Sequence, residues 1–159
     1  MGLDITAYRG IEAVRKQRND DDDGYEDGMA RFWIMPEFKA AADDVKEKTL
    51  YRYAEAFGFR AGSYIGYNRW REWLAGLVGT TPERVWNGEK AKAFQELINF
   101  ADNEGTIGPR TAAKLAKDFA EYDEHAKRVS PDGYDYYDRY KNWRKGFEMA
   151  AQNGAVSFH

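Results

Sequence analysis

The chain has 159 residues, a formal net charge of −3 at pH 7 and a pI near 5.5, and 16% of its residues are aromatic. It contains no cysteine, which excludes disulfides, thiolate zinc sites and cysteine nucleophiles. The length predicts one domain over residues 1–159, the acidic balance argues against a specific nucleic-acid partner, and no apolar run or leader pattern points to a membrane partner or to export. We therefore expect a cytoplasmic protein.

The first half of the chain shows strand patterns. Residues 2–8 alternate apolar and polar side chains, as does a strand with one buried face. The acidic stretch within residues 17–30 predicts an exposed, mobile loop. Residues 31–35 and 49–59 favour two further strands. Residues 10–18 fit either a short helix or a continuation of the first strand.

In the second half the apolar pattern changes to the helical period. A short turn follows Thr81-Pro82, with Thr81 as N-cap, and residues 155–159 favour a terminal strand. Strands first and helices later predict an α+β fold, in which a small antiparallel sheet from the N-terminal half and the C-terminal strand packs with four to five helices. The longer helices are predicted over 67–78, over 89–101, from Pro109 and up to Gly154.

The most polar motif is FRAGSYIGYNRWR, residues 59–71. Its Gly-Ser loop leads into a helix N-terminus, which offers N–H groups and a positive dipole end to an anion, and arginines add forked donors. Arg71 lies beside the apolar face of the predicted helix and Arg69 lies further out, so Arg71 is the better candidate. The alternative is that Ser63 or Asn68 only caps the helix. The ligand-binding candidates are Arg60, Ser63, Tyr64, Tyr67, Asn68 and Arg71, the two tyrosines being stacking candidates because no periodicity explains them.

A second unusual motif is INFADNEGTIGP, residues 98–109. Asp102 and Glu104 could bind ribose hydroxyls, pair with Arg71, hold a metal through water, or act as general acid and base. The alternative is that they cap the two flanking helices. His159 adds an imidazole if the final strand docks near the site, and otherwise it belongs to a frayed end. Asp118, at the edge of an apolar stripe, is a candidate partner for an arginine.

No cofactor and no metal are predicted. The acidic run matches part of an EF-hand loop, but Ala30 occupies the twelfth position, where a bidentate glutamate is needed. His125 and His159 are the only histidines, and they do not have zinc-site spacing. Serine-hydrolase, Walker and dinucleotide-binding glycine patterns are also absent from the sequence.

Five sequence blocks carry a resemblance: MGLDITAY, FRAGSYIGYNRWR, INFADNEGTIGP, LAKDF and GAVSFH. In this order they resemble a family of small uncharacterised proteins encoded by bacteriophages and prophages. The resemblance covers most of the chain except residues 17–30 and 123–135. It implies a phage protein that acts in the bacterial cytoplasm, and it carries no mechanism.

We therefore expect a binding module for an anionic, nucleotide-like small molecule. The first motif would hold phosphate and base, and Asp102, Glu104 and His159 would line the opposite side. A phage protein of this kind could sequester an immune-signalling nucleotide of the host. One alternative is an enzyme that cleaves or modifies such a ligand with Asp102, Glu104 and His159 as acid and base. Another is an inhibitor that binds a host defence enzyme. The sequence leaves the oligomeric state open, a homo-oligomer included.

Overall fold

The computed structural model describes residues 2–14 and 28–159, so most of the predicted acidic loop lies outside the described residues. Thirteen regular α and β elements and one 3₁₀ helix follow one another in this part of the chain. They are β1 (Gly2–Arg9), β2 (Glu12–Ala13), β3 (Met29–Ala30), the 3₁₀ helix η1 (Pro36–Ala42), β4 (Tyr51–Arg52), β5 (Glu55–Ser63), α1 (Tyr64–Leu77), α2 (Pro82–Trp86), α3 (Gln95–Ile98), β6 (Gly105–Ile107), α4 (Pro109–Glu121), α5 (Asp123–Arg128), α6 (Tyr136–Ala150) and β7 (Ala155–Phe158).

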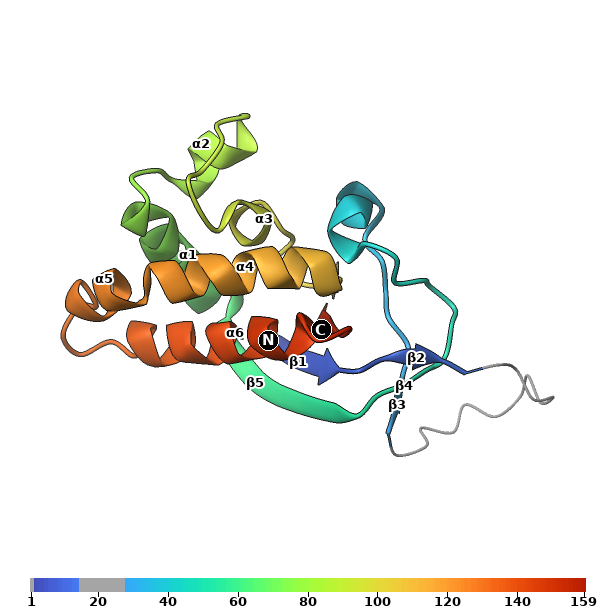
Figure 1. Cartoon of the computed structure of the whole chain (residues 1–159). Helices are drawn as coiled ribbons and strands as arrows, with labels where there is room; N and C mark the ends of the chain where they lie inside the picture. Colours follow the sequence, from blue (N-terminus) through green and yellow to red (C-terminus); the bar gives the residue numbers. More distant parts are fainter. Residues whose placement is uncertain (1, 15–27) are drawn as a thin grey trace.

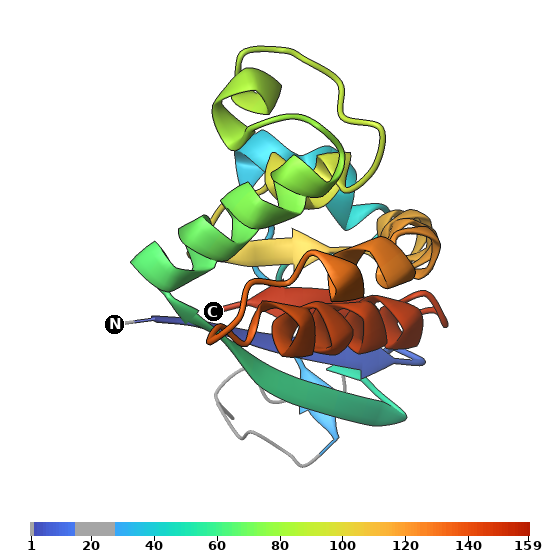
Figure 2. The same cartoon turned by 90° about the vertical axis from the view of Figure 1, so that its left-hand side faces the viewer.

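The main sheet is antiparallel, with strand order β5-β1-β7-β6. It joins N-terminal strands to the C-terminal strand, which confirms the predicted α+β class. A second sheet, with order β2-β4-β3, lies beyond the C-terminal end of β1 (Figure 1). Helix α6 packs along β1 and α4 runs antiparallel beside α6, whereas α2 lies farthest from the main sheet (Figures 1 and 2). No helix among residues 2–14 and 28–159 is both long and apolar enough to cross a membrane.

The core lies between the main sheet and the helices. The alternation of β1 buries Leu3, Ile5 and Ala7 on the helix side of the sheet. Against them pack the aromatic side chains of α1 and α6, and the indoles of Trp70 and Trp143 stack with ring centroids 5.7 Å apart. Burial of large aromatic side chains supplies most of the apolar area here. This packing fixes the orientation of α1 relative to the sheet.

The strand predictions hold in part. The single strand expected over 49–59 is divided into β4 (Tyr51–Arg52) and β5 (Glu55–Ser63). Residues 31–35 form no strand, although the alternation does bury Phe32 and Ile34 in a second apolar cluster. Side chains anchor the backbone of this segment instead: the carbonyl of Trp33 accepts a hydrogen bond from Thr106 Oγ1 at 2.7 Å, and the N–H of Ile34 donates to Glu47 Oε1 at 3.1 Å. Strand β6 was not predicted. It has only three residues, and its partner strand β7 lies far from it in the sequence, so no local pattern indicates the pairing. A period-2 pattern reports a buried face, and it does not report a hydrogen-bonded neighbour.

The helix predictions hold in part. Thr81 caps α2 by accepting a hydrogen bond from the backbone N–H of Arg84 at 3.2 Å, as predicted, and α4 begins at Pro109. The helix predicted over 89–101 is wrong, since only Gln95–Ile98 is helical. Phe94 has a left-handed φ of 62°, which stops the helix from extending toward the N-terminus.

Candidate functional site

The start of α1 is capped by its own loop. Ser63 has an extended backbone, and its Oγ accepts a hydrogen bond from the N–H of Gly66 at 3.0 Å. Arg60, on β5, donates from Nη1 to both carboxylate oxygens of Asp4, at 3.2 and 3.3 Å, in an exposed ion pair. Both predicted ligand-binding side chains are therefore engaged within the fold. The capping alternative is what the structure shows for Ser63.

Tyr67 is a core residue, which corrects its interpretation as an exposed stacking platform. Its side chain is 0% exposed and its ring stacks on Trp70. The hydroxyl makes no hydrogen bond to any part of the chain that the structure describes. Burial raises the pKa of Tyr67 to about 12, while the positive charge of Arg71 opposes that rise and the negative charge of Asp102 adds to it.

Arg71 ties α1 to the turn that follows α3. The residue is 3% exposed, and its Nη1 donates to the backbone carbonyls of Ile98 at 3.3 Å and Phe100 at 2.6 Å. Its guanidinium carbon lies 5.2 Å from the ring centroids of both Tyr67 and Trp86, within cation–π range. Among the described residues no carboxylate forms an ion pair with it, and its Nε has no acceptor.

Asn68 connects Arg71 to Asp102. Its Oδ1 accepts a hydrogen bond from Arg71 Nη2, and its Nδ2 donates to Asp102 Oδ2 at 2.9 Å and to the carbonyl of Tyr64 at 2.9 Å. A guanidinium only donates and a carboxylate only accepts, so these two neighbours determine which way the amide points. The two motifs singled out in the sequence therefore meet in space, through Asn68 rather than through a direct Arg71–Asp102 pair.

A surface pocket of about 390 Å³ opens at this junction. Four predicted site residues line it: Tyr64, Asn68, Arg71 and Asp102. Arg69, which the sequence placed toward solvent, also lines it, together with residues that the sequence did not single out: Ile65, Glu72, Pro82, Glu83 and Trp86.

The most distinctive of the additional residues is Trp86, at the end of α2. Its side chain remains 50% exposed, while its indole Nε1 donates to the carbonyl of Ile98 at 3.3 Å. The hydrogen bond and the neighbouring guanidinium of Arg71 hold the ring in one orientation. Helix α2 has only five residues, too few for periodicity to distinguish a core residue from a site residue.

The three predicted acid/base residues are not joined to one another. Asp102 is bonded to Asn68, and Glu104 is exposed and does not line the pocket. His159 exchanges two backbone hydrogen bonds with Asp4, each 2.9 Å long, and its Nε2 lies 2.9 Å from Thr6 Oγ1. The end of the strand is thus docked on β1 rather than frayed. Within residues 2–14 and 28–159, no group of three or more histidine or carboxylate side chains could hold a metal.

Asp118 has a different partner from the one predicted. It accepts hydrogen bonds from Lys114 Nζ at 2.7 Å and from the backbone N–H of Phe94 at 3.0 Å. Lys114 also pairs with Glu96 at 2.8 Å. The bond from Phe94 fixes the left-handed residue that precedes α3.

Comparisons of the chain with models of known protein families, with curated proteins and with solved structures find no match. The features of the molecule that bear on its function are therefore the α+β fold and the pocket between α1, α2 and the 98–102 turn.

Proposed function

We propose that this chain is a small-molecule-binding protein whose ligand, a nucleotide-like molecule, occupies the pocket between α1, α2 and the 98–102 turn. One observation carries the proposal: a carboxylate, that of Asp102, is held in place at the wall of a pocket that also presents a half-exposed tryptophan. Sites for small ligands commonly combine an aromatic wall with a few fixed polar groups.

Trp86 supports the ring-binding part of the proposal. Its indole N–H is already bonded to the carbonyl of Ile98, and Arg71 lies over the ring. The half of the ring that remains exposed can therefore stack on a flat ligand ring without losing a hydrogen bond. Stacking of a base on an aromatic side chain contributes ~1–3 kcal/mol and tolerates different bases.

Asp102 supports the hydroxyl-binding part. Asn68 uses one oxygen of the carboxylate, and a carboxylate has several acceptor positions. Paired hydroxyls of a ribose are suitable donors for such a group. In the phage setting that the sequence resemblance implies, the protein would sequester a nucleotide-like signalling molecule of the host.

The test is a thermal-shift and tryptophan-fluorescence screen of the purified chain against nucleosides, nucleotides and cyclic dinucleotides. We expect one class to raise the melting temperature and to quench fluorescence, with about 2.7 kcal/mol of stabilisation at a ligand concentration a hundredfold above Kd. Chromatography of the recovered ligand should show it unchanged, because binding without turnover is proposed.

The matched variants are Trp86→Leu and Trp33→Leu. The two indoles are similarly exposed, at 50% and 54%, but Trp33 does not line the pocket. We expect Trp86→Leu to weaken binding roughly tenfold or more through lost stacking and Trp33→Leu to leave it unchanged. Equal effects of the two variants, or no response to any compound of the screen, would refute the proposed site.

A further inference from the structure

We infer that the pocket selects its ligand by ring and hydroxyl groups and disfavours phosphate, so that a nucleoside binds more tightly than the corresponding nucleoside triphosphate. This inference rests on the proposed function and narrows its ligand class. It follows from which donors of the site are still available to a ligand and from the charge of the pocket wall.

The first observation concerns the hydrogen bonds of Arg71. Chelation of a phosphate by arginine needs two parallel N–H donors. Nη1 of Arg71 already serves the carbonyls of Ile98 and Phe100, and Nη2 serves Asn68. Nε and the second proton of Nη2 have no acceptor among the described residues, but the side chain is almost wholly buried. A phosphate could reach this edge of the guanidinium only by displacing the side chains that cover it.

The second observation concerns the N-terminus of α1. The hydroxyl of Ser63 caps the helix and the guanidinium of Arg60 is paired with Asp4. Neither residue lines the pocket. The groups that the sequence suggested for phosphate are therefore occupied within the fold, whereas Trp86 and Asp102 face the pocket.

The third observation concerns charge. Three carboxylates line the pocket, those of Glu72, Glu83 and Asp102, against two arginines, the exposed Arg69 and the buried Arg71. Like charges brought together at a binding surface oppose association. Each added phosphate group therefore costs affinity, while hydroxyl and amino donors of a nucleoside find acceptors.

The test is isothermal titration calorimetry of the full chain with adenosine, guanosine, cytidine and uridine and with their 5′-triphosphates. We expect at least one nucleoside to bind about tenfold more tightly than its triphosphate at low salt, and the difference to shrink at ~1 M salt, where the screening length is only ~3 Å. Glu83→Gln should improve triphosphate binding more than nucleoside binding. Asp138→Asn, which removes a carboxylate on the exposed face of α6, is the control and should leave the ratio unchanged.

A triphosphate that binds more tightly than its nucleoside would overturn this inference while leaving the proposed function in place. Failure of every compound to bind would overturn both. A preference for nucleosides that neither salt nor Glu83→Gln alters would overturn the assignment of the preference to the charge of the pocket wall.

Discussion

The side-chain amide of Asn68 donates to Asp102 across 2.9 Å, although 34 positions separate the two residues in the chain. The same amide accepts from Arg71, so one uncharged side chain satisfies a buried cation on one side and an anion on the other. In a direct ion pair the guanidinium and the carboxylate would be in contact, whereas here the amide of Asn68 lies between them. Asn68 thereby keeps Asp102 at the pocket wall while Arg71 remains buried.

We expect Asn68→Ala to destabilise the fold. The change leaves Arg71 Nη2 and one oxygen of Asp102 without their partner, and an unsatisfied buried polar group costs ~1–3 kcal/mol. Urea unfolding measures the loss. Arg69→Ala, on the exposed side of the same helix, is the control and should shift the midpoint little. An Asn68→Ala variant as stable as the wild type would show that the bridge contributes nothing to folding.

Arg71→Lys should also be destabilising, by about 2–4 kcal/mol, because a lysine cannot reproduce the planar fork that reaches two carbonyls and the asparagine together. The expected consequence is displacement of the 98–102 turn, which the guanidinium holds through Ile98 and Phe100. Hydrogen exchange would show it as faster exchange at residues 99–102. Exchange that rises uniformly over the chain would instead indicate global destabilisation alone.

Tyr67 gives a prediction for alkaline pH. Its folded pKa of about 12 exceeds the ordinary value of 10.0 because burial disfavours the phenolate. Above pH 10 the unfolded chain loses this proton while the folded chain keeps it, so stability falls by up to about 1.4 kcal/mol per pH unit until the folded pKa is reached. Below pH 10 this contribution to stability is fully present.

Tyr67→Phe should reduce that alkaline slope and should cost little at pH 7, because the hydroxyl has no hydrogen-bond partner among the described residues. Urea unfolding between pH 8 and 11 measures both effects. Tyr134→Phe, at an exposed tyrosine, controls for removal of a hydroxyl at the surface. An unchanged slope in Tyr67→Phe would contradict the prediction.

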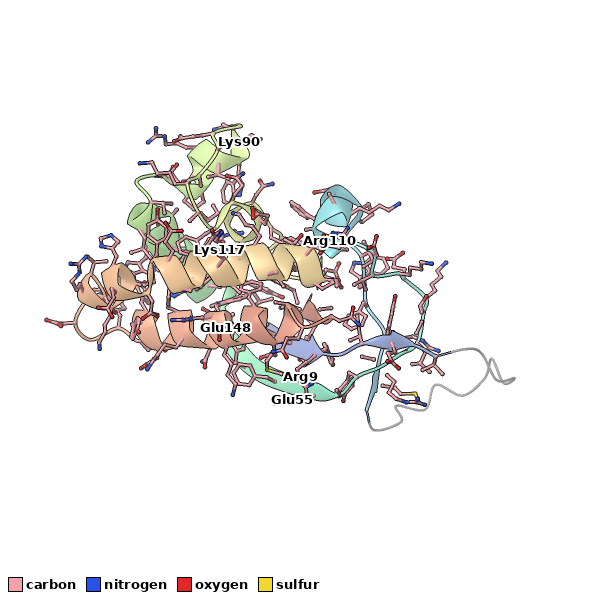
Figure 3. All side chains as sticks on the ribbon, viewed as in Figure 1. Arg9, Glu55, Lys90, Arg110, Lys117 and Glu148 are labelled. Atoms are coloured by element: carbon pink, nitrogen blue, oxygen red, sulfur yellow. The ribbon has the colours of Figure 1, made fainter. Side chains whose placement is uncertain are left out.

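Asp43 and Asp44 are adjacent and should differ sharply on substitution. The Asp43 carboxylate, 7% exposed, accepts from the backbone N–H of Thr111 at 2.9 Å and from its hydroxyl at 3.1 Å, so this residue, which directly follows η1, caps α4. Asp43→Ala should cost ~1–2 kcal/mol. Asp44 is 83% exposed and pairs with Arg110, which Figure 3 labels at the start of α4, so Asp44→Ala should change the thermal midpoint little.

The hydrogen bond of Arg110 lowers the pKa of the Asp44 carboxyl, but both side chains are solvated, so the pair contributes little to folding. Thermal unfolding of the two alanine variants tests the contrast. Equal midpoints for Asp43→Ala and Asp44→Ala would mean that the Asp43 cap does not stabilise α4.

The sequence predicted the fold class and named four of the residues that line the pocket, and its errors have local causes. Tyr67 was placed outside the helical period because the helix was expected to begin there. Helix α1 begins at Tyr64, which puts Tyr67 on the same buried face as Trp70 and Leu74. Strand β5 ends at Ser63, which is also the N-cap of α1, and no periodic pattern in the sequence marks this boundary.

The pocket itself could be predicted only in part. Asn68, Arg71 and Asp102 belong to polar motifs that stand out in the sequence, but Trp86 lies on a helix of one turn and touches Arg71 only because the chain returns there. The left-handed residue Phe94, which ends the non-helical 89–94 stretch, donates its backbone N–H to Asp118, a residue on another helix. Interactions between distant residues decide such positions, and a local pattern carries no information about them.

The pairing of β1 with β7 also bears on the order in which the molecule is assembled. Thr6 and His159 are 153 positions apart, yet their strands are neighbours at the centre of the main sheet. During synthesis, β1 can pair only with β5 until β7 has been made. Until then the edges of β1 and β6 that β7 will occupy have no strand partner. Contacts this distant slow folding, since the whole intervening chain must be closed into a loop first. Completion of the sheet is therefore a late event that follows translation of nearly the entire chain described here.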